Sequence, residues 1–244
     1  MSAKKYETQL LKKLHAALPA YVSVTLLADR GFSDISLFEF IETESGWDYI
    51  IRTKGNINVT QNGVTKQASE WIETMNKPVL SENVFFTNSK FAIPSFVIFR
   101  DKNMKDSWIL VSNKRIAARA MIKYYGKRWG IEPSFRDKKN AKYGLGMSET
   151  HISIPERRDR LLFVASFVIF VMTVLGEVSE KLGFDRLLRA NTSKYRTHSL
   201  FRQGLMLWDL LISRSEDFLK KTIDEFNLLL FDRSKSIQLF ESIA

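Results

Sequence analysis

Residues 47–113 limit the fold of this chain more than any other stretch. They form a series of short runs rich in β-branched and aromatic residues, separated by turn residues such as Gln61-Asn62-Gly63. Runs of this kind predict strands joined by tight turns. The expected strands are 47–52, 57–60, 64–71, 79–87, 96–100 and 108–112. The middle of the chain is therefore predicted to be mostly β.

Helical patterns flank this β section on both sides. Residues 4–18 carry leucines at helical spacing with lysines between them, which predicts an amphipathic helix. A β-rich apolar run over 21–28 follows and ends at Asp29. The other expected helices are a short one over 33–42 capped by Ser33, one from Arg115 onward, a buried core helix over 161–176 and one over 200–213. The chain is thus predicted to belong to the α/β class.

The positive charge is concentrated in one part of the chain. The net charge over 244 residues is +10, and residues 114–160 hold 13 Lys or Arg against 5 Asp or Glu. Such clustering is typical of proteins that bind the phosphate backbone of nucleic acids, although a basic surface can also serve solubility. The sequence has no cysteine, which excludes disulfides and thiolate metal sites and is compatible with a reducing cytoplasm.

The sequence predicts no contact with a membrane. Its longest apolar run, Leu161–Gly176, is shorter than the roughly 20 residues that span a bilayer. The first residues of the chain lack the apolar core of a signal peptide. We therefore expect a cytoplasmic protein, associated with the bacterial nucleoid if it binds DNA, in which the apolar run is buried.

Four side chains that suit phosphate and metal binding follow the β section. Tyr125, Arg128, Glu132 and Lys139 are spaced so that, on a regular helix, they lie within about 60° of one another. Cations and a phenol can hold phosphates while a carboxylate holds a metal ion. Ordinary charge pairing along a solvated helix is the competing explanation.

This spacing resembles the Y-x2-R-x3-E-x6-K (YREK) signature of bacterial insertion-sequence DDE transposases of the insertion sequence 4 type. A second element supports the resemblance, because Asp29-Arg30-Gly31-Phe32 is similar to the D-R-G-F segment that carries the second catalytic aspartate of that family. Three further stretches look like the family, namely Trp47–Arg52, Trp108–Asn113 and Ser199–Gln203.

The resemblance implies a nuclease and strand transferase that acts on double-stranded DNA, at transposon ends and at the target. In that family three carboxylates hold two divalent metal ions, Mg²⁺ or Mn²⁺, which promote phosphodiester transfer. By the resemblance, Asp29 is the second carboxylate and Glu132 the third. Tyr125, Arg128 and Lys139 are the residues implied to hold the phosphates of the transposon end.

The resemblance also implies a fold and a division of the chain. The order of elements matches part of an RNase H-like core with an inserted mostly-β subdomain and C-terminal helices. The implied parts are core residues 1–46, β insertion 47–113, YREK helix 114–150 and helical region 151–244. Trp108 is expected either to stack on an unpaired base at the transposon end or to pack as a core residue. Pro133 and Gly130 predict a kink in the YREK helix beside Glu132.

One catalytic residue of the family has no counterpart here. The first aspartate should precede Asp29, yet Glu7 is the only carboxylate among residues 1–28. We therefore expect the C-terminal portion of a transposase, truncated or accompanied by a separate upstream polypeptide, that forms a homodimer on DNA. The alternatives are a non-catalytic DNA-binding or oligomerising fragment and an inactive remnant. If the chain cuts DNA alone, Asp34 or Asp48 must serve as the third ligand.

Overall fold

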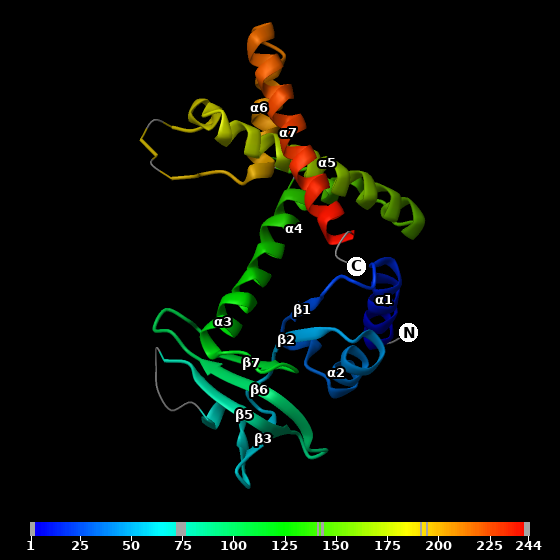
Figure 1. Ribbon diagram of the computed structural model, residues 1–244, viewed down its shortest axis with the longest axis vertical. Helices are drawn as coiled ribbons and strands as arrows, with labels where there is room; N and C mark the ends of the chain where they lie inside the picture. Colours follow the sequence, from blue (N-terminus) through cyan, green and yellow to red (C-terminus); the bar gives the residue numbers. More distant parts are fainter. Residues whose placement is uncertain are drawn as a thin grey trace. The chain divides into compact units, whose positions relative to one another are not determined.

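The computed structural model describes residues 3–71, 77–140, 142, 144–190, 192–193 and 195–241. The chain divides into two compact units, Met1–Trp129 and Gly130–Ala244. The first unit contains the strands, and the second is helical (Figure 1). The structure therefore confirms the α/β class and the C-terminal helices that the sequence predicts.

A seven-stranded sheet forms the centre of the first unit. Its strands are β1 (Thr25–Ala28), β2 (Asp48–Arg52), β3 (Asn58–Gln61), β4 (Val64–Gln67), β5 (Val79–Phe86), β6 (Phe91–Phe99) and β7 (Trp108–Ser112). They lie in the order β1-β2-β7-β6-β5-β3-β4. β1 and β2 run parallel, and the other neighbouring strands are antiparallel. The strand that precedes Asp29 and the strands of the predicted β insertion thus share one continuous sheet.

Helices cover both faces of this sheet. They are α1 (Ala3–Ala17), α2 (Ile35–Phe40) and α3 (Ala118–Gly126). On one face Phe38 of α2 stacks on Tyr49 of β2, with 4.9 Å between ring centroids. On the other face Met121 of α3 packs in a cluster with Ile50, the next residue of β2. Successive residues of a strand point to opposite faces, so the centre of β2 must be apolar on both, and Tyr49–Ile51 form an unbroken apolar run between Asp48 and Arg52.

Two element boundaries differ from the sequence prediction for clear physical reasons. The N-cap of α2 is Asp34 and not Ser33, because the Asp34 carboxylate accepts a hydrogen bond from the Ser36 N–H at 2.9 Å. β6 begins well before the predicted residue 96 and runs through Pro94. Proline has no N–H to donate, and the register between β5 and β6 passes over Pro94 and Asn83 without pairing them.

The described part of the second unit contains four α-helices: α4 (Ile131–Lys139), α5 (Pro155–Lys181), α6 (Leu200–Leu211) and α7 (Glu216–Glu241). α5 and α6 touch backbone to backbone at two glycines. A Cβ added to Gly204 would lie 1.8 Å from the carbonyl oxygen of Met172, and one added to Gly176 would lie 1.9 Å from that of Leu200. Only glycine permits this approach, which explains the glycine in the interior of each helix.

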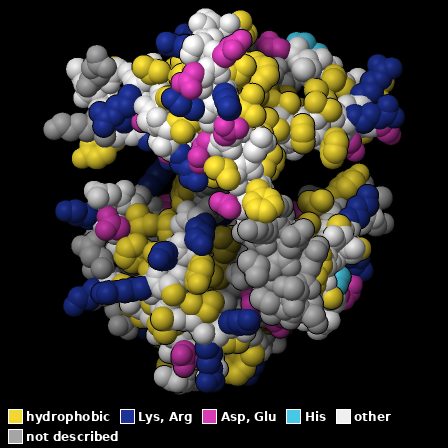
Figure 2. Space-filling model, turned by 45° about the horizontal axis from the view of Figure 1, so that its top comes forward, with side chains coloured by type: hydrophobic (Ala, Val, Ile, Leu, Met, Phe, Trp, Pro, Cys, Tyr) yellow, Lys and Arg dark blue, Asp and Glu magenta, His cyan; other side chains and the backbone are white. Residues whose placement is uncertain are grey.

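The apolar helix α5 is buried over only part of its length. Val174 and Leu175 lie in clusters with residues of α7 and α6, whereas Phe163 is 78% exposed and Phe167 is 63% exposed. The prediction of a buried core helix over 161–176 is therefore wrong for its first half, because hydropathy reports composition and not which neighbours cover a helix. By length and composition alone α5 could cross a membrane, and 28% of its most apolar window is buried. Figure 2 shows hydrophobic side chains at the surface among the Lys and Arg side chains.

Candidate nucleic-acid interface

Asp29 directly follows β1, at the C-terminal end of the parallel strand pair. Its Oδ1 accepts a hydrogen bond from the Gly31 N–H at 2.9 Å and caps the 3-10 turn Arg30–Phe32. A Cβ on residue 31 would lie 3.1 Å from that oxygen, which favours glycine there. The second oxygen, Oδ2, lies 4.0 Å from Nη1 of Arg128, and the Asp29 side chain is 47% exposed. The fold thus brings together two of the residues that the sequence predicts for the site.

Arg128 lies against two aromatic rings. Its guanidinium carbon is 5.1 Å from the ring centroid of Trp129 and 5.9 Å from that of Tyr125, within the range of cation–π attraction. Tyr125 is only 1% exposed, and the half-buried Trp108 meets its ring edge-on, with 5.0 Å between centroids. Burial raises the pKa of the Tyr125 phenol, and the charges of Arg128 and Arg52 oppose that rise. Tyr125 and Trp108 therefore pack behind the Arg128 side chain.

The segment predicted as one YREK helix is interrupted. α3 ends at Gly126, a 3-10 turn covers Lys127–Gly130, and α4 begins at Ile131. The sequence predicted a kink at Gly130 and Pro133, and the interruption ends at Gly130, before Pro133. Pro133 is the third residue of α4, in the first turn, where a helix leaves its N–H groups unpaired in any case. Proline at this position therefore does not break the helix.

Glu132 and Lys139 belong to the second unit. Both are exposed on α4, and the Lys139 Nζ lies 5.7 Å from the ring centroid of Phe135. The convergence of the Glu132 and Asp29 carboxylates on one cleft stays a prediction. The binding of phosphates by Lys139 and the stacking of Trp108 on a base stay predictions as well.

The two alternative third ligands have other positions or roles. Asp48 is the first residue of β2 and lies opposite Thr25, the first residue of β1, so it is at the far end of the parallel strands from Asp29. Asp34 caps α2. Among the residues that the structure describes, no three Asp, Glu, His or Cys side chains come together. Mg²⁺ and Mn²⁺ take several oxygen ligands, which carboxylates, carbonyl groups and water can supply.

A basic pocket of about 380 Å³ lies at the same end of the strands as Asp29. It is lined by Arg30, which follows Asp29, by Arg52 and Lys54 at the end of β2, and by Asp106 in the connection from β6 to β7. No pattern in the sequence predicts this pocket. The Arg52 guanidinium donates to the Ser107 carbonyl, 55 residues away, and no local pattern signals such a contact.

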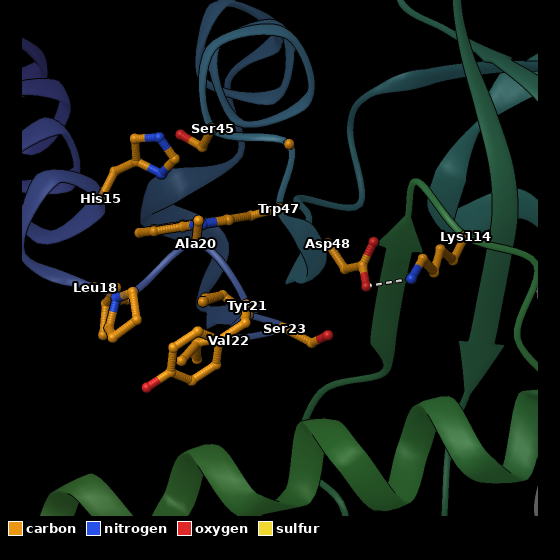
Figure 3. Close-up of a pocket in the computed structure, with 13 residues that line it drawn as sticks. His15, Leu18, Ala20, Tyr21, Val22, Ser23, Ser45, Trp47, Asp48 and Lys114 are labelled. Atoms are coloured by element: carbon orange, nitrogen blue, oxygen red, sulfur yellow. Dashed lines mark ion pairs between the residues drawn. The ribbon is translucent and has the colours of Figure 1, made fainter. Parts of the chain in front are cut away.

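A second pocket, of about 250 Å³, lies at the opposite end of β1 and β2 (Figure 3). There His15 meets the ring of Trp47 edge-on at 5.5 Å between centroids. Asp48 pairs with Lys114 at 2.6 Å, the ion pair drawn in Figure 3. The charged groups of this pocket are therefore already matched to each other within the protein.

A family model for the transposase DDE domain matches residues 2–158. The match covers well over half of the chain and includes the whole sheet, Asp29 and the segment from Tyr125 to Lys139. No curated protein matches the chain.

Proposed function

This chain belongs to the transposase DDE-domain family, and we propose that it acts on transposon-end DNA as the C-terminal portion of a YREK-type transposase. The observation that carries the proposal is the approach of Arg128 to Asp29 at 4.0 Å, at the carboxyl end of a parallel strand pair. Sites of α/β proteins typically lie at that end of the strands. The pair joins one residue of the D-R-G-F segment to one of the YREK signature.

The phosphate grip is proposed to centre on Arg128. Its guanidinium lies against the rings of Tyr125 and Trp129, which restrict its orientation beside Asp29. A preordered guanidinium loses less conformational entropy when it binds a phosphate. Tyr125 acts in this proposal by positioning Arg128, because its ring is buried. Lys139, exposed on α4, is proposed as a further phosphate contact.

Asp29 and Glu132 are proposed as two of the three acidic ligands that the family uses. Transposases of this family generally depend on divalent metal ions, which activate the attacking oxygen and stabilise the leaving one. The third carboxylate is proposed to come from an upstream polypeptide. The sheet order supports this idea, since within the described residues β1 pairs with β2 and its other edge has no strand beside it. An unpaired edge is a template for one more strand.

The non-catalytic alternatives have a specific observation in their favour, because the described residues hold no set of three metal ligands. We therefore expect the 244-residue chain to bind transposon-end DNA without cutting it. Adding the upstream region of the element, fused or as a separate polypeptide, should produce Mg²⁺- or Mn²⁺-dependent nicking. The chain is proposed to act in the cytoplasm, as a homodimer on DNA.

The test is a nicking assay on DNA that carries both ends of the element. Glu132→Gln in the completed protein should abolish nicking and leave binding intact, whereas Asp137→Asn, an equal change of charge on the same helix, should preserve both. Nicking by the chain alone would contradict the need for an upstream carboxylate. If the completed protein neither binds nor nicks DNA, the inactive remnant is the correct interpretation.

A further inference from the structure

The basic pocket beside Asp29 contains an acidic residue in an unusual place. The Oδ2 atom of Asp106 lies 3.9 Å from Nη1 of Arg30 and 4.0 Å from Nη2 of Arg52. One carboxylate oxygen thus sits between two guanidinium groups, at the outer limit of ion pairing with each. The Asp106 side chain is 56% exposed, whereas that of Arg52 is 17% exposed. The carboxylate therefore lies at the mouth of the pocket and the Arg52 side chain lies deeper.

Polar atoms behind this carboxylate lack partners. The Oγ1 of Thr53 and the Nε of Arg52 are buried and make no hydrogen bond within the described structure. Thr53 itself is only 3% exposed and lines the pocket. Buried polar atoms of this kind destabilise a protein unless a ligand or water satisfies them. Both residues line the basic pocket, which indicates a site built for an anion with several acceptor oxygens.

We propose that this pocket binds a phosphate group of the DNA backbone, and that the Asp106 carboxylate occupies the phosphate position while DNA is absent. The inference rests on the proposed function, since it names a further DNA contact of the same interface. Two guanidinium groups and Lys54 provide the positive charge, and a phosphate can accept hydrogen bonds from Arg52 and Thr53 at once. Binding moves Asp106 outward, and a phosphodiester with the same single negative charge takes its place between the two guanidinium groups.

This exchange gives the site a selective property. An anion can bind Arg30 and Arg52 only by displacing the Asp106 carboxylate. Because Asp106 is part of the same chain, weakly binding anions do not displace it. The pocket also fixes where the DNA strand passes, because Arg30, which lines the pocket, is the residue next to Asp29. A phosphate bound in the pocket holds the neighbouring phosphodiester close to the Asp29 carboxylate.

The first experiment compares Asp106→Asn with Asp101→Asn in the full chain, by titrating a labelled DNA duplex. Asp101 lies in the same connection between β6 and β7, and its Oδ1 accepts a hydrogen bond from the Asn103 N–H at 3.0 Å. Both variants add one unit of net positive charge. Asp106→Asn should tighten binding about two- to fivefold, the range expected for release of an exposed ion pair. Asp101→Asn should change affinity less, and equal effects would show that Asp106 acts only through net charge.

The second experiment tests the two deeper residues. Arg52→Gln should reduce the slope of log affinity against log salt by about 0.9, the contribution of one phosphate contact. In the Arg52→Gln background, Asp106→Asn should no longer tighten binding, since the two changes act on one site. Thr53→Val should weaken DNA binding and raise thermal stability, because it removes a buried hydroxyl that has no partner in the free protein. A residue that only supports the fold would not produce opposite effects on stability and binding.

The outcomes separate this inference from the proposed function. If the unaltered chain shows no salt-dependent binding of DNA, the proposed function itself fails. If the chain binds DNA and responds to neutralisation of Arg128 and Lys139, but not to changes at Arg52, Thr53 or Asp106, only the phosphate pocket is refuted. Circular dichroism of each variant shows whether it folds. If Arg52→Gln unfolds the protein, the comparison of Asp106→Asn with Asp101→Asn still tests the inference, because the Asp106 side chain is exposed.

Discussion

The two ends of the β1–β2 strand pair carry similar residue types in different arrangements. At the N-terminal end Asp48 and Lys114 form a close ion pair at 2.6 Å. At the C-terminal end three contacts between a carboxylate and an arginine lie at 3.9 to 4.0 Å. Buried polar atoms without a hydrogen bond occur at both ends, Ser45 Oγ at the first and Thr53 Oγ1 at the second. The first end has satisfied its charges internally, and the second has not. The comparison indicates that the C-terminal end is arranged for an external ligand.

The largest expected difference between the two ends concerns catalysis. If the proposed upstream polypeptide restores nicking, Asp29→Asn should reduce nicking of transposon-end DNA about a thousandfold or more, since metal-assisted charge stabilisation is worth several kcal/mol. Asp48→Asn should leave the rate within a few fold of the unaltered protein. A gel assay of nicked products measures both. Equal losses would remove the distinction between the two ends.

The next effect concerns DNA affinity. Neutralising Arg128 and Lys139 together should lower the salt slope of duplex binding by about 1.8, because each phosphate contact contributes roughly 0.9. Neutralising Lys114, whose charge is matched by Asp48, together with Lys66, a cation of β4 close to the Trp71 ring, serves as the control. The control pair should change the slope by less than one contact. Fluorescence anisotropy at several salt concentrations supplies the slopes.

A smaller effect concerns stability, and here the N-terminal end is expected to matter more than the C-terminal end. Asp48→Asn breaks a close ion pair and should lower the free energy of unfolding by up to about 1 kcal/mol. Arg128→Gln should cost no more than that, since its distance to Asp29 is longer and the packing of Tyr125 and Trp108 remains. Urea denaturation distinguishes the two. A large loss in Arg128→Gln alone would indicate a structural role for the C-terminal end.

The smallest effect is a pH dependence that arises close to the N-terminal end. Tyr49, the residue after Asp48, donates its hydroxyl to Oε1 of Glu42 at 3.0 Å. Burial raises the pKa of Glu42 above its ordinary value. A carboxyl whose pKa is higher in the folded state favours folding when protonated, so its contribution to stability is lost as pH rises through the folded pKa.

Glu42→Gln should therefore flatten the pH dependence of stability in the mildly acidic range. Thermal melts at a series of pH values measure this, with Glu82→Gln, an exposed carboxylate of β5, as the control. If stability varies with pH in the same way in Glu42→Gln as in the unaltered protein, Glu42 does not contribute to the pH dependence.

The sequence alone determined the features that depend on local pattern. β2 and β7 were predicted within one residue because each is a continuous apolar run bounded by polar residues. Gln61-Asn62-Gly63 marked the turn between β3 and β4, where Asn62 and Gly63 have positive φ. The D-R-G-F and YREK spacings indicated the transposase DDE family, which the match over residues 2–158 confirms. These features could be predicted because each depends on residues that are close together in the sequence.

Only the tertiary structure decided how distant residues meet. It placed Asp106 between Arg30 and Arg52, buried the Tyr125 ring behind Arg128, and divided the YREK segment between two units at residues 129 and 130. It also left the first half of α5 exposed, although its composition is that of a core helix. Burial and charge pairing depend on which segments pack together, and that packing depends on residues throughout the chain. A pattern within one segment reports what the segment could bury or bind, whereas the fold determines which partner it meets.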